Sequence, residues 1–117
     1  MDYDKICKDV LDLDPKIRFA GICDDEGDTK YGGLREGIIS HLSPEETKKS
    51  VQLALGRWGL RDALIQKTGK AKYAMAEYEK VKRVTMPLSD DYLLLISMEV
   101  DADHNRIIDR ALKIINQ

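Results

Sequence analysis

The sequence predicts an α+β domain built around one five-stranded, mostly antiparallel sheet with helices on both faces. Turn signals divide the chain into patterned segments in the order helix, strand, strand, helix, strand, strand, strand, helix. Two of the predicted strands are apolar on both faces, which is typical of interior strands. The length of 117 residues suits one core, so we expect residues 1–117 to fold as a single domain.

The amino-terminal segments predict a helix followed by a β-hairpin. Over residues 2–12 the apolar side chains recur at helical spacing, and Asp14-Pro15 ends the helix because a residue before proline is disfavoured in the α region. Strands are expected at 17–23 and 29–35, joined by a short acidic loop. Gly32-Gly33 within the second strand indicates a bulge or a close backbone contact.

The middle helix has the clearest start signal in the chain. Ser43 is a good N-cap, Pro44 suits the first helical position, and Glu46 completes a capping box. We expect this helix to span 44–67, with Gly69 as its carboxyl-terminal stop. Its length is sufficient for a crossover between the two groups of strands.

Three strands and a last helix complete the predicted fold. The strands are expected at 71–78, 81–87 and 92–99, and the last of them is apolar on both faces and therefore central. The final helix is expected at 103–115, because its apolar residues lie on one side. Helices on both sides then bury the two faces of the sheet.

The middle helix carries two apolar stripes, although a helix that packs on a sheet needs only one. At about 100° per residue, one stripe consists of Val51, Ala54, Leu55, Trp58 and Ile65. The opposite stripe consists of Leu53, Gly56, Leu60, Ala63 and Leu64. One gap between the stripes holds Ser50, Arg57 and Arg61. The second stripe needs a cover, because an exposed apolar patch marks an association surface.

Pairing of two copies is the favoured cover for this second stripe. Gly56 and Gly59 each cost about 1 kcal/mol in a helix interior, and they would be tolerated if another backbone approached closely there. A symmetric dimer is the commonest way to cover such a face. Two alternatives stay open: the chain's own loops cover the stripe, or the glycines mark a break between two shorter helices.

Composition and charge exclude several classes of function. The formal net charge of −2 provides no global field for nucleic acid or an anionic membrane, and the basic group Lys80, Lys82 and Arg83 is interpreted as a solvated sheet face. The charged start lacks the apolar stretch of a signal peptide, and no apolar run is long enough to span a bilayer. Cys7 and Cys23 are expected to be buried free thiols, so we expect a cytoplasmic protein. The charge and the lack of a long apolar run predict no nucleic-acid or membrane partner.

Residues that invite a chemical interpretation have structural explanations. The acidic loop at 24–28 lacks the ligand spacing of an EF-hand and is expected to be a hairpin turn. His41 and His104 lack further metal ligands at suitable spacing, and the glycine-rich run at 32–37 lacks the pattern of a phosphate-binding loop. No nucleophile with a base is recognisable, so we predict no catalytic, cofactor-binding or metal site and no enzyme activity.

The element order, together with Gly21-Ile22-Cys23-Asp24-Asp25-Glu26-Gly27, resembles the roadblock/dynein light chain family. This resemblance spans nearly the whole chain and rests mainly on element order. A narrower resemblance, to small archaeal proteins of unassigned function, is carried by the segments 13–19, 32–37 and 77–88. The broader resemblance implies a profilin-like sheet with the first and last helices on one face and the middle helix on the other.

The family resemblance also implies a function. It implies homodimers in which the middle helices, here 44–67, pack antiparallel and the third strands, here 71–78, join edge to edge. The implied interface comprises Leu53, Gly56, Arg57, Leu60, Ala63, Leu64, Tyr73 and Met75. Family members bind small GTPases or act as scaffold subunits, so we expect a non-catalytic adaptor module that needs no cofactor. The alternative is a small-ligand sensor domain, which predicts a cavity of roughly 300 Å³ or more lined by a few polar groups.

Overall fold

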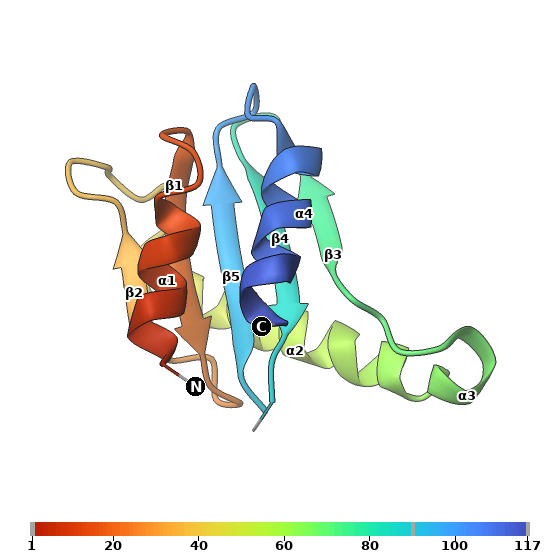
Figure 1. Ribbon diagram of the computed structural model, residues 1–117. Helices are drawn as coiled ribbons and strands as arrows, with labels where there is room; N and C mark the ends of the chain where they lie inside the picture. Colours follow the sequence, from red (N-terminus) through yellow and green to blue (C-terminus); the bar gives the residue numbers. More distant parts are fainter. Residues whose placement is uncertain (1, 90, 117) are drawn as a thin grey trace.

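The computed structural model describes residues 2–89 and 91–116 and confirms the predicted fold class (Figure 1). In chain order the elements are α1 (Tyr3–Leu11), β1 (Ile17–Cys23), β2 (Thr29–Leu34), α2 (Pro44–Asp62), α3 (Ile65–Thr68), β3 (Ala74–Glu77), β4 (Lys82–Pro87), β5 (Leu93–Met98) and α4 (His104–Ile115). The five strands form one sheet in the order β2-β1-β5-β4-β3, and each neighbouring pair is antiparallel. β1 and β5, predicted to be interior, hold interior positions.

The helices divide between the two faces of the sheet as the family resemblance implied. In Figure 1, α1 and α4 lie side by side on one face, and α2 crosses behind the sheet on the other. We call these the two-helix face and the single-helix face. The core of the two-helix face is one continuous cluster that includes Val10, Ile17, Ile22, Val84, Met86, Leu94, Ile96, Met98, Ile107 and Ala111.

The core of the single-helix face is smaller and divided. One cluster consists of Cys23, Val51 and Leu95, and the other consists of Ala54, Trp58 and Leu93. Trp58 Nε1 donates a hydrogen bond to Thr85 Oγ1 at 2.9 Å, which fixes the indole against β4. The stripe of α2 that faces the sheet is therefore the one that contains Val51 and Trp58.

α2 is longer than the sheet is wide. Its 19 residues span about 28 Å at 1.5 Å per residue, whereas five strands spaced about 4.8 Å apart span about 19 Å. Figure 1 shows the consequence, since α2 runs from the β2 side of the sheet and its carboxyl-terminal end projects past β3. Buried side chains in α2 accordingly stop at Trp58.

The prediction of one helix over 44–67 is wrong at its carboxyl-terminal end. The capping box at its start is formed, but α2 ends at Asp62 and the short α3 follows. Helices in proteins are stabilised mainly by packing, and this part of the helix has no sheet beneath it. The break lies after Asp62, so the alternative that Gly56 and Gly59 interrupt the helix is also wrong.

The prediction of a strand over 71–78 is also too long, because β3 spans only Ala74–Glu77. The strand ends at a tight turn in which the Tyr78 N–H donates to the Val81 carbonyl oxygen at 2.8 Å. At its start, the register places Lys72 opposite Pro87. Proline has no N–H to donate, so the ladder does not extend further.

The interpretation of the basic group on β4 as a solvated face is wrong. Lys82 is only 6% exposed; its Nζ donates to the Ala102 carbonyl oxygen at 3.0 Å and lies 2.9 Å from His104 Nδ1. Arg83 is half-buried on the single-helix face. Neighbouring residues of a strand point to opposite faces, and both faces of this strand are covered by helices.

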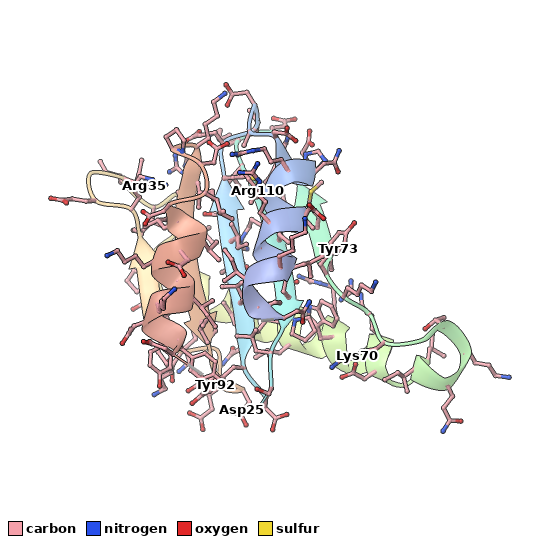
Figure 2. All side chains as sticks on the ribbon, viewed as in Figure 1. Asp25, Arg35, Lys70, Tyr73, Tyr92 and Arg110 are labelled. Atoms are coloured by element: carbon pink, nitrogen blue, oxygen red, sulfur yellow. The ribbon has the colours of Figure 1, made fainter. Side chains whose placement is uncertain are left out.

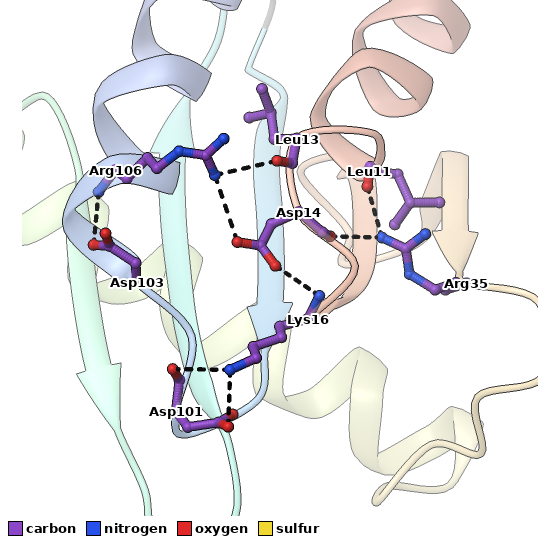
Figure 3. A network of polar contacts seen from close by, with 8 residues as sticks. All are labelled: Leu11, Leu13, Asp14, Lys16, Arg35, Asp101, Asp103 and Arg106. Atoms are coloured by element: carbon purple, nitrogen blue, oxygen red, sulfur yellow. Dashed lines mark hydrogen bonds and ion pairs between the residues drawn. The ribbon is translucent and has the colours of Figure 1, made fainter.

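Arg35 gives the glycine-rich run a structural role. Its Nε donates to the Ile17 carbonyl oxygen at 2.7 Å, and its Nη2 donates to those of Leu11 and Asp14 at 2.6 and 2.8 Å. Figure 3 shows the guanidinium reaching the end of α1 and the loop that follows it. At Gly32, where φ is +73°, a Cβ would lie 2.2 Å from a carbonyl oxygen of β1. The run therefore closes the sheet edge against α1.

Among the residues that the structure describes, no helix is both long and apolar enough to cross a membrane.

Candidate functional site

The stripe of α2 that points away from the sheet is exposed to solvent. We call Leu53, Gly56 and Leu60 of α2, together with Ala63 and Leu64 just after its end, the outer stripe. Leu53 is 58% exposed, Leu60 is 73% exposed and Leu64 is 56% exposed. Within the described parts of the chain, the loops leave this stripe uncovered, so the alternative that they cover it is wrong.

The two glycines of α2 have no role within a single copy of the chain. A Cβ built at Gly56 or Gly59 meets no atom within 4 Å outside the helix's own backbone. Gly32 and Gly27 differ, because a Cβ at either would collide with a neighbouring element. Glycine destabilises a helix interior by about 1 kcal/mol relative to alanine, and nothing in one copy compensates for that cost.

β3 is an edge strand beside the projecting end of α2. It pairs only with β4, so its other edge presents unpaired backbone groups. Figure 1 shows that this free edge lies on the side toward which α2 projects. Tyr73, labelled in Figure 2 just before β3, is 46% exposed. Met75 differs from the other predicted interface residues, because it is half-buried and packs against the core of the two-helix face.

Arg57 lies in a groove that sequence reasoning did not identify. Arg57, Arg61 and Arg83 line a hollow of about 270 Å³ between α2 and strands β3 and β4. Arg83 donates a hydrogen bond to Ser50 Oγ, and the guanidinium carbon of Arg61 lies 5.1 Å from the ring centroid of Trp58. Burial lowers the pKa of the Arg83 guanidinium. We call this hollow the three-arginine groove.

The sequence contained part of the signal for this groove. Ser50, Arg57 and Arg61 fall in one gap between the two stripes of the helix, which shows that they share a flank. The third arginine comes from β4, and no pattern within the sequence indicates that this strand lies beneath that flank. The predicted interface therefore included Arg57 but not Arg61 or Arg83.

The acidic loop between β1 and β2 is a hairpin turn, as predicted. Asp24 Oδ1 accepts hydrogen bonds from the backbone N–H groups of Glu26 and Asp28, each at 3.0 Å. The Asp28 N–H is the main cause of the lowered pKa of the Asp24 carboxyl. Across the described residues, no three His, Cys, Asp or Glu side chains gather in a way that could hold a metal ion.

Both cysteines are buried free thiols, as predicted. Burial raises the pKa of the Cys7 thiol to about 11, and it also raises the pKa of Cys23. A thiol with a raised pKa is a poor nucleophile at neutral pH, because the thiolate is the reactive form. These residues therefore serve the core.

The sequence profile of a family of unknown function, DUF6659, matches residues 1–117. The chain belongs to this family. No protein of curated function matches the sequence.

Solved structures with the same fold include roadblock/LC7 domains and a profilin. The roadblock/LC7 domain from Streptomyces avermitilis has a TM-score of 0.71 at 14% identity, covering 99% of this chain and 93% of that one. The gliding protein MglB from Thermus thermophilus has a TM-score of 0.72 at 14% identity, covering 95% and 83%. Profilin II from Acanthamoeba castellanii has a TM-score of 0.58 at 12% identity, covering 98% and 94%. These similarities establish a roadblock/profilin-like fold.

Proposed function

We propose that this chain is a non-catalytic pairing module in which two copies associate through the outer stripe of α2 and the free edge of β3. The uncovered outer stripe is the observation that carries this proposal. Gly56 and Gly59 support it, because their missing side chains would let two helices approach closely. The position of β3 supports it as well, since a second β3 could extend the sheet while the projecting ends of α2 pack together.

The estimated free energy of association indicates that pairing needs both the outer stripe and the β3 edge. Completing the burial of a leucine that is already about half covered contributes roughly 1 to 1.5 kcal/mol. Leu53, Leu60 and Leu64 from two copies would then contribute roughly 6 to 9 kcal/mol. Association costs about 4 to 15 kcal/mol in lost translational and rotational freedom. The helices alone therefore give a weak pair, and the β3 edge and Tyr73 must add to it.

Introducing a charge into the outer stripe tests the pairing. Leu60→Asp and Leu53→Asp should shift the molar mass from that of a pair to 13.3 kDa, measured by light scattering at tens of micromolar. Ile39→Asp is the matched control, because Ile39 is 85% exposed in the loop before α2 and should leave the mass unchanged. A wild-type chain that is monomeric at this concentration would refute the proposal.

Gly56→Ala separates a role in pairing from a role in folding. In a single copy this substitution should stabilise the helix by about 0.5 to 1 kcal/mol, because a Cβ at Gly56 meets open space. In a pair it should instead weaken association at least several-fold, because the second backbone approaches there. Thermal unfolding at low and high protein concentration distinguishes the two results.

We further propose that the pair acts in the cytoplasm as an adaptor, either as a regulator of a small GTPase or as a scaffold subunit. The resemblance to the roadblock family and the shared fold support this role. The test is to mix the purified protein with candidate small GTPases in their GDP- and GTP-bound forms. A complex that prefers one nucleotide state supports regulation, whereas no complex with any candidate rejects the GTPase role and leaves pairing unaffected.

A second candidate function, binding of a small ligand, is favoured by the space between α2 and the sheet. A hollow of about 600 Å³ lies beneath the start of α2, next to the three-arginine groove, and Arg83 and Leu95 line both. The larger hollow exceeds the roughly 300 Å³ expected for a sensor, but both hollows are open at the surface rather than internal. Binding of any small molecule there, with no change of molar mass, would favour this candidate over pairing.

A further inference from the structure

The three-arginine groove gathers positive charge that no acidic side chain of residues 2–89 and 91–116 neutralises through a salt bridge. Two other arginines pair with carboxylates: Arg18 Nη1 lies 2.7 Å from Glu99 Oε1, and Arg106 Nη1 lies 3.5 Å from Asp14 Oδ2. In the described part of the chain, Arg57, Arg61 and Arg83 form no salt bridge, and no Asp or Glu lines the groove. This concentration of cations occurs in a chain with a net charge of −2.

Contacts hold two of these three cations in place, whereas Arg57 is exposed on the flank of α2. Arg83 is half-buried and is held by Ser50, while Arg61 lies over the Trp58 ring, which is itself fixed by Thr85. Three positive groups around one small hollow repel one another, and partial burial raises the cost of the Arg83 charge. A negative group in the groove would relieve both effects. The site is therefore preorganised for an anion rather than for a neutral molecule.

The shape and the polarity of the groove limit the anion to a small molecule. Its volume of about 270 Å³ is just below the range of ligand pockets, which run from about 300 to 1,000 Å³. Guanidinium groups match carboxylate and phosphate oxygens in a two-pronged geometry. Apolar side chains, among them Ala54, Leu93 and Leu95, line the same hollow and form what we call its floor. An oxyanion attached to a compact apolar or aromatic body satisfies both parts.

We infer that the three-arginine groove binds a small organic anion, in which a phosphate or carboxylate group contacts Arg57, Arg61 and Arg83 and an apolar body rests on the floor. This inference gives the ligand-binding candidate its chemistry and rests on it. It concerns a single copy of the chain, so it does not depend on pairing.

Trp58 provides a direct measurement, because it is the single tryptophan of the chain and Arg61 lies over its ring. The probes are phenyl phosphate, phenylacetate, inorganic phosphate and, as a neutral analogue, benzyl alcohol. We expect a saturable change in Trp58 fluorescence with phenyl phosphate or phenylacetate that weakens as salt increases. Inorganic phosphate should bind at least tenfold more weakly, and benzyl alcohol should give no saturable change. The two aromatic probes distinguish a phosphate from a carboxylate ligand.

Variants assign the effect to the groove. Arg83→Gln should weaken binding at least tenfold, and Arg57→Gln and Arg61→Gln should each weaken it several-fold. Arg83→Lys keeps the charge but loses the two-pronged geometry of the guanidinium group. Its affinity for the probe should therefore lie between those of Arg83→Gln and the wild type. Arg110→Gln is the matched control, because Arg110 is exposed on α4 on the opposite side of the sheet (Figure 2). Circular dichroism confirms that each variant is folded.

Three results would overturn the inference. The first is the absence of a saturable signal with either aromatic anion. The second is binding that Arg110→Gln weakens as much as Arg83→Gln does, which would indicate general charge attraction. The third is a combined result: the groove variants change the molar mass of the protein, and the wild type binds none of the probes. That result would assign the arginines to the pairing surface, so it would reject the anion site and leave the pairing proposal in place.

Discussion

The two faces of the sheet are packed differently, and the difference supports the proposal that the single-helix face is the one that interacts. On the two-helix face, α1, α4 and the sheet form one continuous core cluster. On the single-helix face, α2 contributes two small clusters, with hollows of about 600 and 270 Å³ beside them. One face holds most of the hydrophobic core, and the other keeps exposed leucines, arginines and open space.

A simple geometric cause lies behind this difference. Two helices lie along the strands of one face and cover most of its width, whereas α2 alone crosses the other face. A single helix cannot cover five strands, since packed helices are spaced about 8 to 10 Å apart. The single-helix face is therefore the less covered of the two, and both the pairing proposal and the anion-site inference concern this side of the molecule.

The largest expected effect comes from two neighbouring leucines of β5 that point to opposite faces. Leu94→Ala should destabilise the fold by about 4 kcal/mol, because it leaves a closed cavity in the continuous core. Leu95→Ala should cost about 2 kcal/mol, because Leu95 already borders both hollows and water can enter. Urea unfolding of both variants measures the difference. Equal costs would show that the two faces are packed alike.

The next largest effect should come from Arg35. Arg35→Ala removes three hydrogen bonds from a guanidinium to backbone carbonyls and should cost about 2 to 3 kcal/mol in the free energy of unfolding. Arg35→Lys should recover only a minor part, because an ammonium group cannot reach the three carbonyls in the same geometry. Arg110→Ala serves as the control and should change stability by less than about 0.5 kcal/mol. If Arg35→Ala leaves the free energy of unfolding unchanged, the two-helix face does not need these hydrogen bonds at its edge.

Trp58→Phe tests how firmly α2 is held. It keeps an aromatic ring but removes the hydrogen bond to Thr85, so it should destabilise the fold by about 1 kcal/mol. Thr85→Val removes the acceptor instead, and the double variant should cost less than the sum of the two single variants. Thermal unfolding of the three proteins checks this. Additive costs would mean that the bond contributes nothing to docking of the helix.

The smallest effect concerns the thiol of Cys7 and alkaline pH. Its pKa is raised by burial to about 11, so folding favours the protonated form. The associated stability is complete below the unfolded pKa of about 8.5 and is lost as the pH rises toward 11. Between pH 7 and 9 the loss should stay below about 1 kcal/mol, and Cys7→Ala should abolish this contribution. Urea midpoints at pH 7 and pH 9 measure this loss of stability. If the stability of Cys7→Ala changes with pH as much as that of the wild type, the pH dependence belongs to other groups.

Pattern within the sequence was sufficient for most of the fold. Asp14-Pro15 and the capping box at Ser43 placed the boundaries of helices, because these signals act over a few residues. Apolar residues on both faces of β1 and β5 identified the interior strands. The two stripes of α2 were also visible, since helical periodicity depends only on the spacing along the chain.

Only the tertiary structure decided the relations between segments that are distant in sequence. The sheet selects the stripe with Val51 and Trp58, because Thr85 and Leu93 lie beneath it, while the outer stripe stays free. The width of the sheet ends α2 at Asp62, because helix without packing beneath it is marginal. Arg83 joins the arginines of α2, and Lys82 is buried on the other side, because helices cover both faces of β4. The sequence by itself determined which surfaces could be buried, and the packing of distant elements determined which of them were.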